Sequence, residues 1–259
     1  MSSSTWTPPA VASESVHVEL PLWRAVEAQH VVATRALVDN RQEQELLEAL
    51  LEADKPPRPP GAAGLDYLLF TPFRYAPAAL GSRFRAFTDP GVWYGAELIR
   101  TACAEVGYWR WRFLLASAGL KRLDAVPHTI FQARASGRSV DLRAPPFQRD
   151  QQRWGDPVDY SACQAFAQVA RQAQIQLIRY RSVRDPRHAG AAAVLELSAF
   201  RGSGGVRRRQ SWFLTVDRGR ASWLRAGSHP GQVQAHEFMF DAHALSPPAA
   251  VPPADPGPA

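Results

Sequence analysis

Three side chains that could act together on one ligand lie at equal spacings in the middle of the chain. Arg83, Tyr94 and Glu105 follow one another at intervals of 11 residues. They offer a forked cation that binds anionic groups, an aromatic ring that stacks on planar groups, and a carboxylate that stabilises positive charge. A single helix glutamate is more often half-exposed and paired with a nearby arginine, here Arg83 or Arg110. The regular combination favours a functional site instead.

The local sequence predicts how these three side chains are positioned. Residues 89–91 read Asp-Pro-Gly and predict a tight turn, because proline presets its backbone angle and glycine tolerates positive φ. Residues 92–94 are strand formers, and Gly95 ends the run. A helix then follows over residues 97–109, in which apolar positions recur every three or four residues beside Glu105.

This central stretch resembles the RES-domain family, which is named for its arginine, glutamate and serine. The family pattern is a Gly-Gly-Arg-Phe/Trp loop, a strand that ends in tyrosine, and a helix with Ala-Glu-Val. The corresponding residues here are Gly-Ser-Arg-Phe at 81–84, Trp-Tyr at 93–94 and Ala-Glu-Val at 104–106. The spacings agree with the family.

Two further segments extend the resemblance over roughly residues 64–200. Residues 73–75, Phe-Arg-Tyr, resemble the family's Arg-Tyr pair and add Arg74 and Tyr75. Residues 178–183 resemble the strand end that supplies the family's serine, here Ser182, with Arg181 where proline is usual.

The resemblance implies an α+β fold similar to the ADP-ribosyltransferases of the diphtheria-toxin type, with NAD as substrate. The family's described activities are NAD phosphorolysis, NAD hydrolysis and transfer of ADP-ribose to a protein. Its members are toxins of type II toxin–antitoxin pairs, and the usual partner is an Xre-type helix-turn-helix antitoxin. We therefore expect a hetero-oligomer in which any DNA contact belongs to the partner.

The resemblance divides six residues between catalysis and substrate binding. The catalytic group is Glu105, Arg83 and Ser182, and the NAD-binding group is Tyr94, Arg74 and Tyr75. Breaking the nicotinamide–ribose bond builds positive charge on the ribose, so a fixed carboxylate stabilises the transition state more than the ground state.

We expect an NAD phosphorylase that uses phosphate as co-substrate and gives nicotinamide and ADP-ribose-1″-phosphate. Two alternatives stay open, an ADP-ribosyltransferase that modifies a protein and a non-catalytic module that binds NAD. No metal is expected, since the histidines and both cysteines, Cys103 and Cys163, lack metal-ligand spacing.

Composition narrows the class of protein. The 259 residues include 30 basic and 24 acidic side chains, and the net charge of +6 could suggest a nucleic-acid partner. Nearly all the basic residues are arginines spread along the chain rather than gathered in one stripe, so we expect no direct nucleic-acid contact.

The start of the chain has no basic and apolar leader, and no stretch has the length of a membrane span. We therefore expect a cytoplasmic protein without a membrane contact.

The chain divides by composition into four parts. Residues 1–15 are expected to be disordered, residues 16–60 to form a helical extension with a proline-rich linker, residues 61–245 to form the RES domain, and residues 246–259 to form a disordered tail. Within the extension, apolar periodicity predicts a helical hairpin over residues 22–38 and 41–52.

The rest of the RES region predicts mixed secondary structure. A helix is expected over residues 162–173. The predicted strands cover residues 65–71, 128–133, 139–142, 174–180, 191–197, 207–216 and 220–224, with a turn at residues 136–137.

Overall fold

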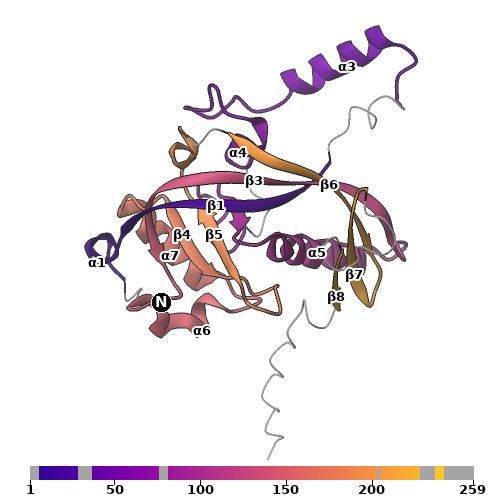
Figure 1. Ribbon diagram of the computed structural model, residues 1–259. Helices are drawn as coiled ribbons and strands as arrows, with labels where there is room; N and C mark the ends of the chain where they lie inside the picture. The colour runs from indigo at the N-terminus through magenta and orange to yellow at the C-terminus, as the bar shows by residue number, and fades with distance from the viewer. Residues whose placement is uncertain (1–5, 29–36, 76–80, 203–204, 228–236, 242–259) are drawn as a thin grey trace, which may run out of the picture.

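One mixed sheet and a set of helices make up the computed structural model (Figure 1), which describes residues 6–28, 37–75, 81–202, 205–227 and 237–241. The strands are β1 Val16–Glu27, β2 Trp93–Ala96, β3 Leu123–Asp141, β4 Leu177–Arg181, β5 Gly190–Val194, β6 Val206–Val216, β7 Arg220–Arg225 and β8 Glu237–Asp241. The helices are α1 Pro8–Ser13, α3 Arg41–Ala53, α4 Tyr67–Arg74, α5 Ile99–Ala116, α6 Gln151–Trp154 and α7 Ser161–Gln172, with short 3-10 turns η1 Phe147–Asp150 and η2 Leu197–Phe200. The predicted α+β class is confirmed.

The sheet order brings distant parts of the sequence together. The strands follow the order β1-β2-β5-β4-β3-β6-β7-β8, and β1 also pairs with β3. The five strands β1, β2, β5, β4 and β3 therefore close on themselves. Among the described strands, β3 and β4 form the one parallel pair, and all other pairs are antiparallel.

The first half of the predicted helical hairpin is wrong, because residues 16–27 form strand β1. Alternate residues from Val16 to Leu22 are apolar, which is the period of a strand. All twelve residues of β1 pair with β3, from Val16 opposite Ser139 to Glu27 opposite His128. This long pairing overrides the approximate helical period of the residues that follow. Residues 29–36, which the hairpin prediction also covers, lie outside the described residues.

The prediction of disorder over residues 1–15 is wrong for its second half. Residues 8–13 form helix α1, and Trp6 and Val11 are buried in an apolar core. The Trp6 ring packs on Phe147 with 4.6 Å between ring centroids, and its indole N–H donates to Asp150 at 2.9 Å. Ring contacts with Phe147 and Phe166 and one hydrogen bond thus fix a segment whose composition alone is typical of a flexible end.

The second predicted helix of the extension is confirmed as α3. Asn40 caps it by accepting from the Glu43 backbone N–H at 2.9 Å. Helix α3 projects away from the sheet (Figure 1) and contains no buried residue. The apolar positions that predict the helix, among them Leu46, Leu50 and Leu51, are therefore exposed rather than packed on the sheet.

Two other elements differ from the sequence prediction. Residues 65–71 were expected to be a strand, but Asp66 caps helix α4 by accepting from the Leu68 N–H at 3.0 Å. Residues 128–142 were expected to be two strands, but β3 runs through the predicted turn, because Gly137 pairs with Val18 of β1. Helices α5 and α7 and the strands corresponding to β2, β4, β5, β6 and β7 are confirmed.

Three apolar cores hold the sheet and helices together. One lies between α1, α7 and the face of the sheet that includes Ile178 and Tyr180. A second lies under α4 and η2 around Trp93 and Phe131. The third joins α5 to β6, β7 and β8 around Trp223. Helix α5 is thus fixed along one side of the sheet, where it can hold Glu105 rigidly.

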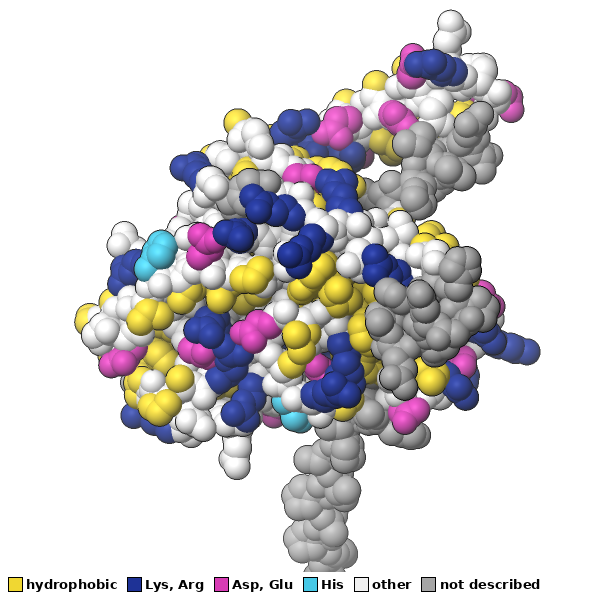
Figure 2. All heavy atoms as spheres, in the orientation of Figure 1, with side chains coloured by type: hydrophobic (Ala, Val, Ile, Leu, Met, Phe, Trp, Pro, Cys, Tyr) yellow, Lys and Arg dark blue, Asp and Glu magenta, His cyan; other side chains and the backbone are white. Residues whose placement is uncertain are grey.

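On the face seen in Figure 2, Lys and Arg side chains are interspersed with acidic and hydrophobic ones. Among the described residues, no helix is both long and apolar enough to cross a membrane.

Candidate functional site

A cavity of about 440 Å³ opens where strands β1 and β2 meet helix α5. Its wall is completed by the loop before α7 and by the end of β4. The lining residues are Trp23, Arg24, Ala25, Gly81, Ser82, Arg83, Tyr94, Gly95, Ala96, Ala102, Glu105, Val106, Trp109, Tyr160, Tyr180, Arg184 and Ala191. The three equally spaced residues of the sequence therefore line one cavity.

Arg83 reaches the cavity from the loop before β2. Its guanidinium is buried and donates through Nη1 to the carbonyls of Trp154 and Asp156, both at 2.9 Å. It also lies over the Tyr160 ring, 4.5 Å from the centroid. The turn that carries it begins at Gly81 with φ +66°, where a side chain would collide with the Arg85 carbonyl. Arg83 thus joins two loops that form opposite parts of the cavity wall.

Tyr94 lies on β2, and its hydroxyl holds the loop that carries Arg83. Its phenol oxygen accepts from the Phe84 N–H at 2.9 Å and lies 2.8 Å from Ser82 Oγ. Burial raises the pKa of Tyr94 to about 12, so the phenol is neutral at physiological pH. The ring is held in a single position beside the cavity.

Glu105 and Ser182 form a hydrogen-bonded pair. Helix α5 places Glu105 in the cavity wall, and Ser182 Oγ donates to Glu105 Oε1 at 2.5 Å. Ser182 follows β4 directly and is fully buried, and its oxygen also accepts from the backbone N–H groups of Arg184 and Asp185 at 3.2 and 3.0 Å. Burial raises the pKa of Glu105, while Ser182 and the nearby guanidinium of Arg83 favour its ionised form.

Arg24 lines the cavity, and sequence reasoning did not include it among the candidate residues. It lies on β1, donates through Nη1 to the Tyr94 carbonyl at 3.0 Å, and lies 5.2 Å from the Trp93 ring centroid. Burial lowers the pKa of Arg24 to about 10, which still leaves it charged at neutral pH. The strand period of residues 16–22 was the signal that could have placed Trp23 and Arg24 at the sheet edge facing α5.

Arg74 and Tyr75 lie elsewhere. Arg74 ends α4, where it donates to Glu52 at 3.0 Å and to the Pro56 carbonyl at 2.5 Å. Tyr75 is 38% exposed, and its carbonyl accepts from Arg85. Neither residue lines the cavity, and the Arg74 guanidinium is engaged by Glu52 and Pro56.

The loop after β4 adds a second buried guanidinium. Arg184 lies 3.6 Å from the centroid of the Tyr108 ring and donates to the Pro157 carbonyl at 2.5 Å and to the Tyr160 hydroxyl at 3.0 Å. No motif signals Arg184 in the sequence. Tyr180, the adjacent wall residue on β4, packs edge-on against Phe84 with 4.9 Å between ring centroids.

The cavity is therefore rich in cations. Arg24, Arg83 and Arg184 line it with Glu105 as the single carboxylate among the lining residues, which suits a ligand with more than one negative charge. Within the described part of the chain, no group of three histidine, cysteine, aspartate or glutamate side chains is arranged to hold a metal ion.

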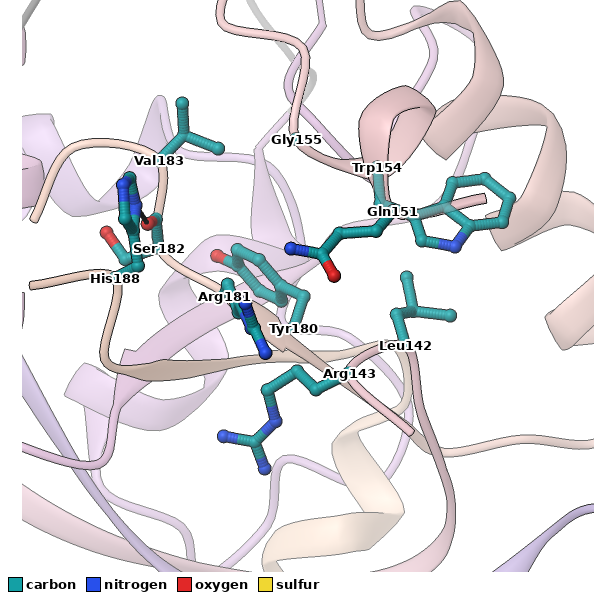
Figure 3. A pocket seen from close by; sticks show the side chains of 10 residues that line it. All are labelled: Leu142, Arg143, Gln151, Trp154, Gly155, Tyr180, Arg181, Ser182, Val183 and His188. Carbon is teal, nitrogen blue, oxygen red and sulfur yellow. Dashed lines mark hydrogen bonds between the residues drawn. The ribbon is translucent and has the colours of Figure 1, made fainter. Parts of the chain in front are cut away.

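A smaller cavity of about 220 Å³ shares Tyr180 with the larger cavity and is also lined by Ser182 (Figure 3). It opens at the carboxyl ends of the parallel strands β3 and β4. Its lining residues are Leu142, Arg143, Gln151, Trp154, Gly155, Tyr180, Arg181, Ser182, Val183 and His188.

Comparison with known proteins identifies the family. Among solved structures, the chain is similar to the crystal structure of the M. tuberculosis MbcT-MbcA toxin-antitoxin complex, with 14% sequence identity, a TM-score of 0.47, and coverage of 80% of this chain and 91% of that chain. A search of curated proteins finds no match. The RES domain model matches residues 55–217, which is more than half of the chain and includes Arg83, Tyr94, Glu105 and Ser182. The chain therefore belongs to the RES domain family.

Proposed function

We propose that this RES-domain protein is an enzyme that breaks the nicotinamide–ribose bond of NAD in the 440 Å³ cavity. The observation that carries the proposal is Glu105, held by Ser182, as the one carboxylate among the lining residues of a cavity that also presents Arg24, Arg83 and Arg184. A fixed carboxylate in such a place stabilises a developing cation, and the arginines suit the diphosphate of a dinucleotide.

The chemistry follows from the position of Glu105. As the bond between ribose C1″ and the nicotinamide nitrogen breaks, its electron pair goes to the nicotinamide ring, which leaves neutral. The ribose becomes an oxocarbenium-like centre, and the Glu105 carboxylate stabilises it near the 2″-hydroxyl. Ser182 holds the carboxylate in one orientation through its 2.5 Å hydrogen bond.

The substrate would be held by two kinds of contact. The guanidinium groups of Arg24, Arg83 and Arg184 would bind the diphosphate, since forked donors match phosphate oxygens. The fixed Tyr94 ring would stack on the nicotinamide. The observed position of Arg24 leads us to assign it the substrate-binding role that the sequence resemblance gave to Arg74 and Tyr75.

Phosphate is the proposed acceptor. Its oxygen would bond to C1″ as nicotinamide departs, so the products are nicotinamide and ADP-ribose-1″-phosphate. Water as acceptor would give ADP-ribose, and a protein side chain would give an ADP-ribosylated target.

We also propose that the protein is the toxin of a pair whose partner is an Xre-type helix-turn-helix antitoxin. An apolar strip leads away from the cavity along α5 and supports a protein partner. Trp109, which lines the cavity, is 53% exposed, and Phe113 one turn further along is 52% exposed. Exposed aromatic residues beside a functional cavity are typical of a protein interface.

The test is release of nicotinamide from NAD by the purified protein, with and without phosphate. Phosphate-stimulated release with ADP-ribose-1″-phosphate as product supports the proposal in full. Release that is indifferent to phosphate, with ADP-ribose as product, replaces phosphorolysis by hydrolysis. Labelled ADP-ribose on a lysate protein favours transfer, and NAD binding without any product leaves only a binding module.

A further inference from the structure

The smaller cavity carries features of a second binding site (Figure 3). It lies beyond the carboxyl ends of β3 and β4, which are the parallel pair of the described sheet. Parallel strands commonly leave a crevice at this end, where ligands bind. At about 220 Å³ it is smaller than the roughly 300–1,000 Å³ of sites for whole drug-sized ligands. It suits one ring system with its substituents at the mouth.

Two aromatic side chains give this cavity rigid walls. Trp154 donates its indole N–H to the Phe147 carbonyl at 2.9 Å, which fixes the ring. Tyr180 is buried and packs edge-on against Phe84. Fixed aromatic walls favour a planar ligand, because stacking then costs little conformational entropy.

Two polar side chains at this cavity have no protein partner among the described residues. The Gln151 carboxamide extends towards Tyr180 in Figure 3 and makes no side-chain hydrogen bond within the described chain. The Arg181 guanidinium is exposed and, within the same described part, takes part in no ion pair. Arg143 differs, since Asp141 and Glu97 accept from its guanidinium at 2.8 to 2.9 Å. Gln151 and Arg181 are thus the groups free to bind a ligand.

We propose that the smaller cavity binds an adenosine monophosphate moiety. The aromatic walls would hold the base, the Gln151 carboxamide would pair with a donor and an acceptor on the adenine edge, and Arg181 would bind the phosphate at the mouth. The moiety could be free or part of a dinucleotide whose other half occupies the larger cavity. The second case rests on the proposed function, and the first does not.

The direct test is calorimetric titration of the full chain with AMP. Gln151→Ala and Arg181→Gln should each weaken AMP affinity about tenfold, the loss that one hydrogen bond or charge-assisted contact of about 1.4 kcal/mol produces. The matched controls are Gln152→Ala and Arg187→Gln, exposed neighbours outside both cavities, which should bind as the wild type does. Equal AMP affinity in the wild type and the Gln151→Ala/Arg181→Gln double variant would overturn the proposal. So would equal affinity for ribose 5-phosphate, which lacks the base.

Two substrates identify the source of the moiety. If it is the adenylate half of NAD, Gln151→Ala raises the KM for NAD and leaves the KM for nicotinamide mononucleotide unchanged. If it is a free nucleotide, Gln151→Ala leaves both KM values unchanged, and AMP still binds in the presence of NAD. Should neither substrate be cleaved, the proposed function fails, while the AMP titration still decides the second site.

Discussion

At the scale of single residues, the proposed reaction depends on Glu105, whose negative charge is destabilised by burial. Burial raises the pKa of Glu105, and Ser182 together with Arg83 offsets part of that cost. Groups that take part in catalysis are often held in positions that lower the stability of the fold, because the reaction requires them there.

Glu105→Gln should therefore stabilise the fold at neutral pH while it slows turnover. Because the pKa of Glu105 is raised, the folded protein keeps a proton that the unfolded chain releases between the ordinary glutamate pKa and the raised one. Stability falls as the pH rises through that window, and glutamine removes this dependence. At pH values above this window, we expect the Tm of Glu105→Gln to exceed that of the wild type by a few degrees. Calorimetry over a range of pH measures both Tm values. A lower Tm at every pH would contradict the account.

The pH profile of the wild-type reaction reports the same residue. The ionised carboxylate is the active form, so the rate should rise with pH through the raised pKa of Glu105, later than an ordinary glutamate would allow. The pH dependence of kcat/KM, which reports the pKa values of the free enzyme, checks this. A rate that already rises at the usual glutamate pKa would show that Glu105 does not act in the reaction.

Tyr94→Phe should loosen the Arg83 loop. The change removes the phenol oxygen that accepts from the Phe84 N–H and leaves that buried group unpaired, at a cost of about 1–3 kcal/mol. Denaturant unfolding measures the loss, and the KM for NAD should rise with it. Tyr75→Phe is the matched control, since Tyr75 is exposed and lines neither cavity. Equal losses in the two variants would show that the phenol of Tyr94 does not support the loop.

At the scale of elements, the N-terminal strand completes a site that otherwise belongs to the family-matched region. Strand β1 lies before residue 55, where the RES match begins, yet it supplies Trp23, Arg24 and Ala25 to the cavity wall. The start of that strand is anchored by Val11 of helix α1 and by Trp6, which precedes the helix.

Trp6→Ala should destabilise the protein by about 3–5 kcal/mol, the usual cost of deleting a buried tryptophan. The variant loses the packing on Phe147 and the hydrogen bond to Asp150. Urea unfolding measures the change, and Glu14→Ala on the exposed side of the same segment should stay within 0.5 kcal/mol of wild type. A loss below about 1 kcal/mol for Trp6→Ala would mean that α1 is not part of the core.

Sequence reasoning brought together three residues that line the larger cavity and missed others that line it, for physical reasons. Arg83, Tyr94 and Glu105 are joined by a turn, a strand and a helix within 23 residues, so local signals suffice to bring them together. Arg24 reaches them because β1 pairs with β3, more than 100 residues away. The alternating apolar residues at 16–22 indicate a strand, but they do not identify the strand with which it pairs. Arg74 was placed in the site by a dipeptide resemblance, whereas its ion pair with Glu52 holds it elsewhere.

At the scale of the whole molecule, α3 is separate from the body. Leu46, Leu50 and Leu51 are 61%, 60% and 47% exposed, and Glu52 joins the helix to Arg74 at its base. The three apolar cores contain no residue of α3. The fold and both cavities are thus complete without this helix.

Replacing Leu46 and Leu50 by glutamine should change the free energy of unfolding by less than about 0.5 kcal/mol per site, since exposed substitutions rarely matter more. Nicotinamide release should also be unchanged. Leu69→Ala in α4, which is fully buried, is the contrasting variant and should cost about 2–5 kcal/mol. A large loss from the α3 substitutions would show that the leucine stripe is buried in solution.

The central claim is that Glu105 stabilises the transition state for breaking the nicotinamide–ribose bond. The most direct measurement compares NAD affinity with nicotinamide release in the wild type and Glu105→Gln. We predict that NAD affinity stays within a few-fold, while kcat falls by about 10²–10³ or more, because the lost interaction develops only in the transition state. Turnover by Glu105→Gln at the wild-type rate would contradict the account.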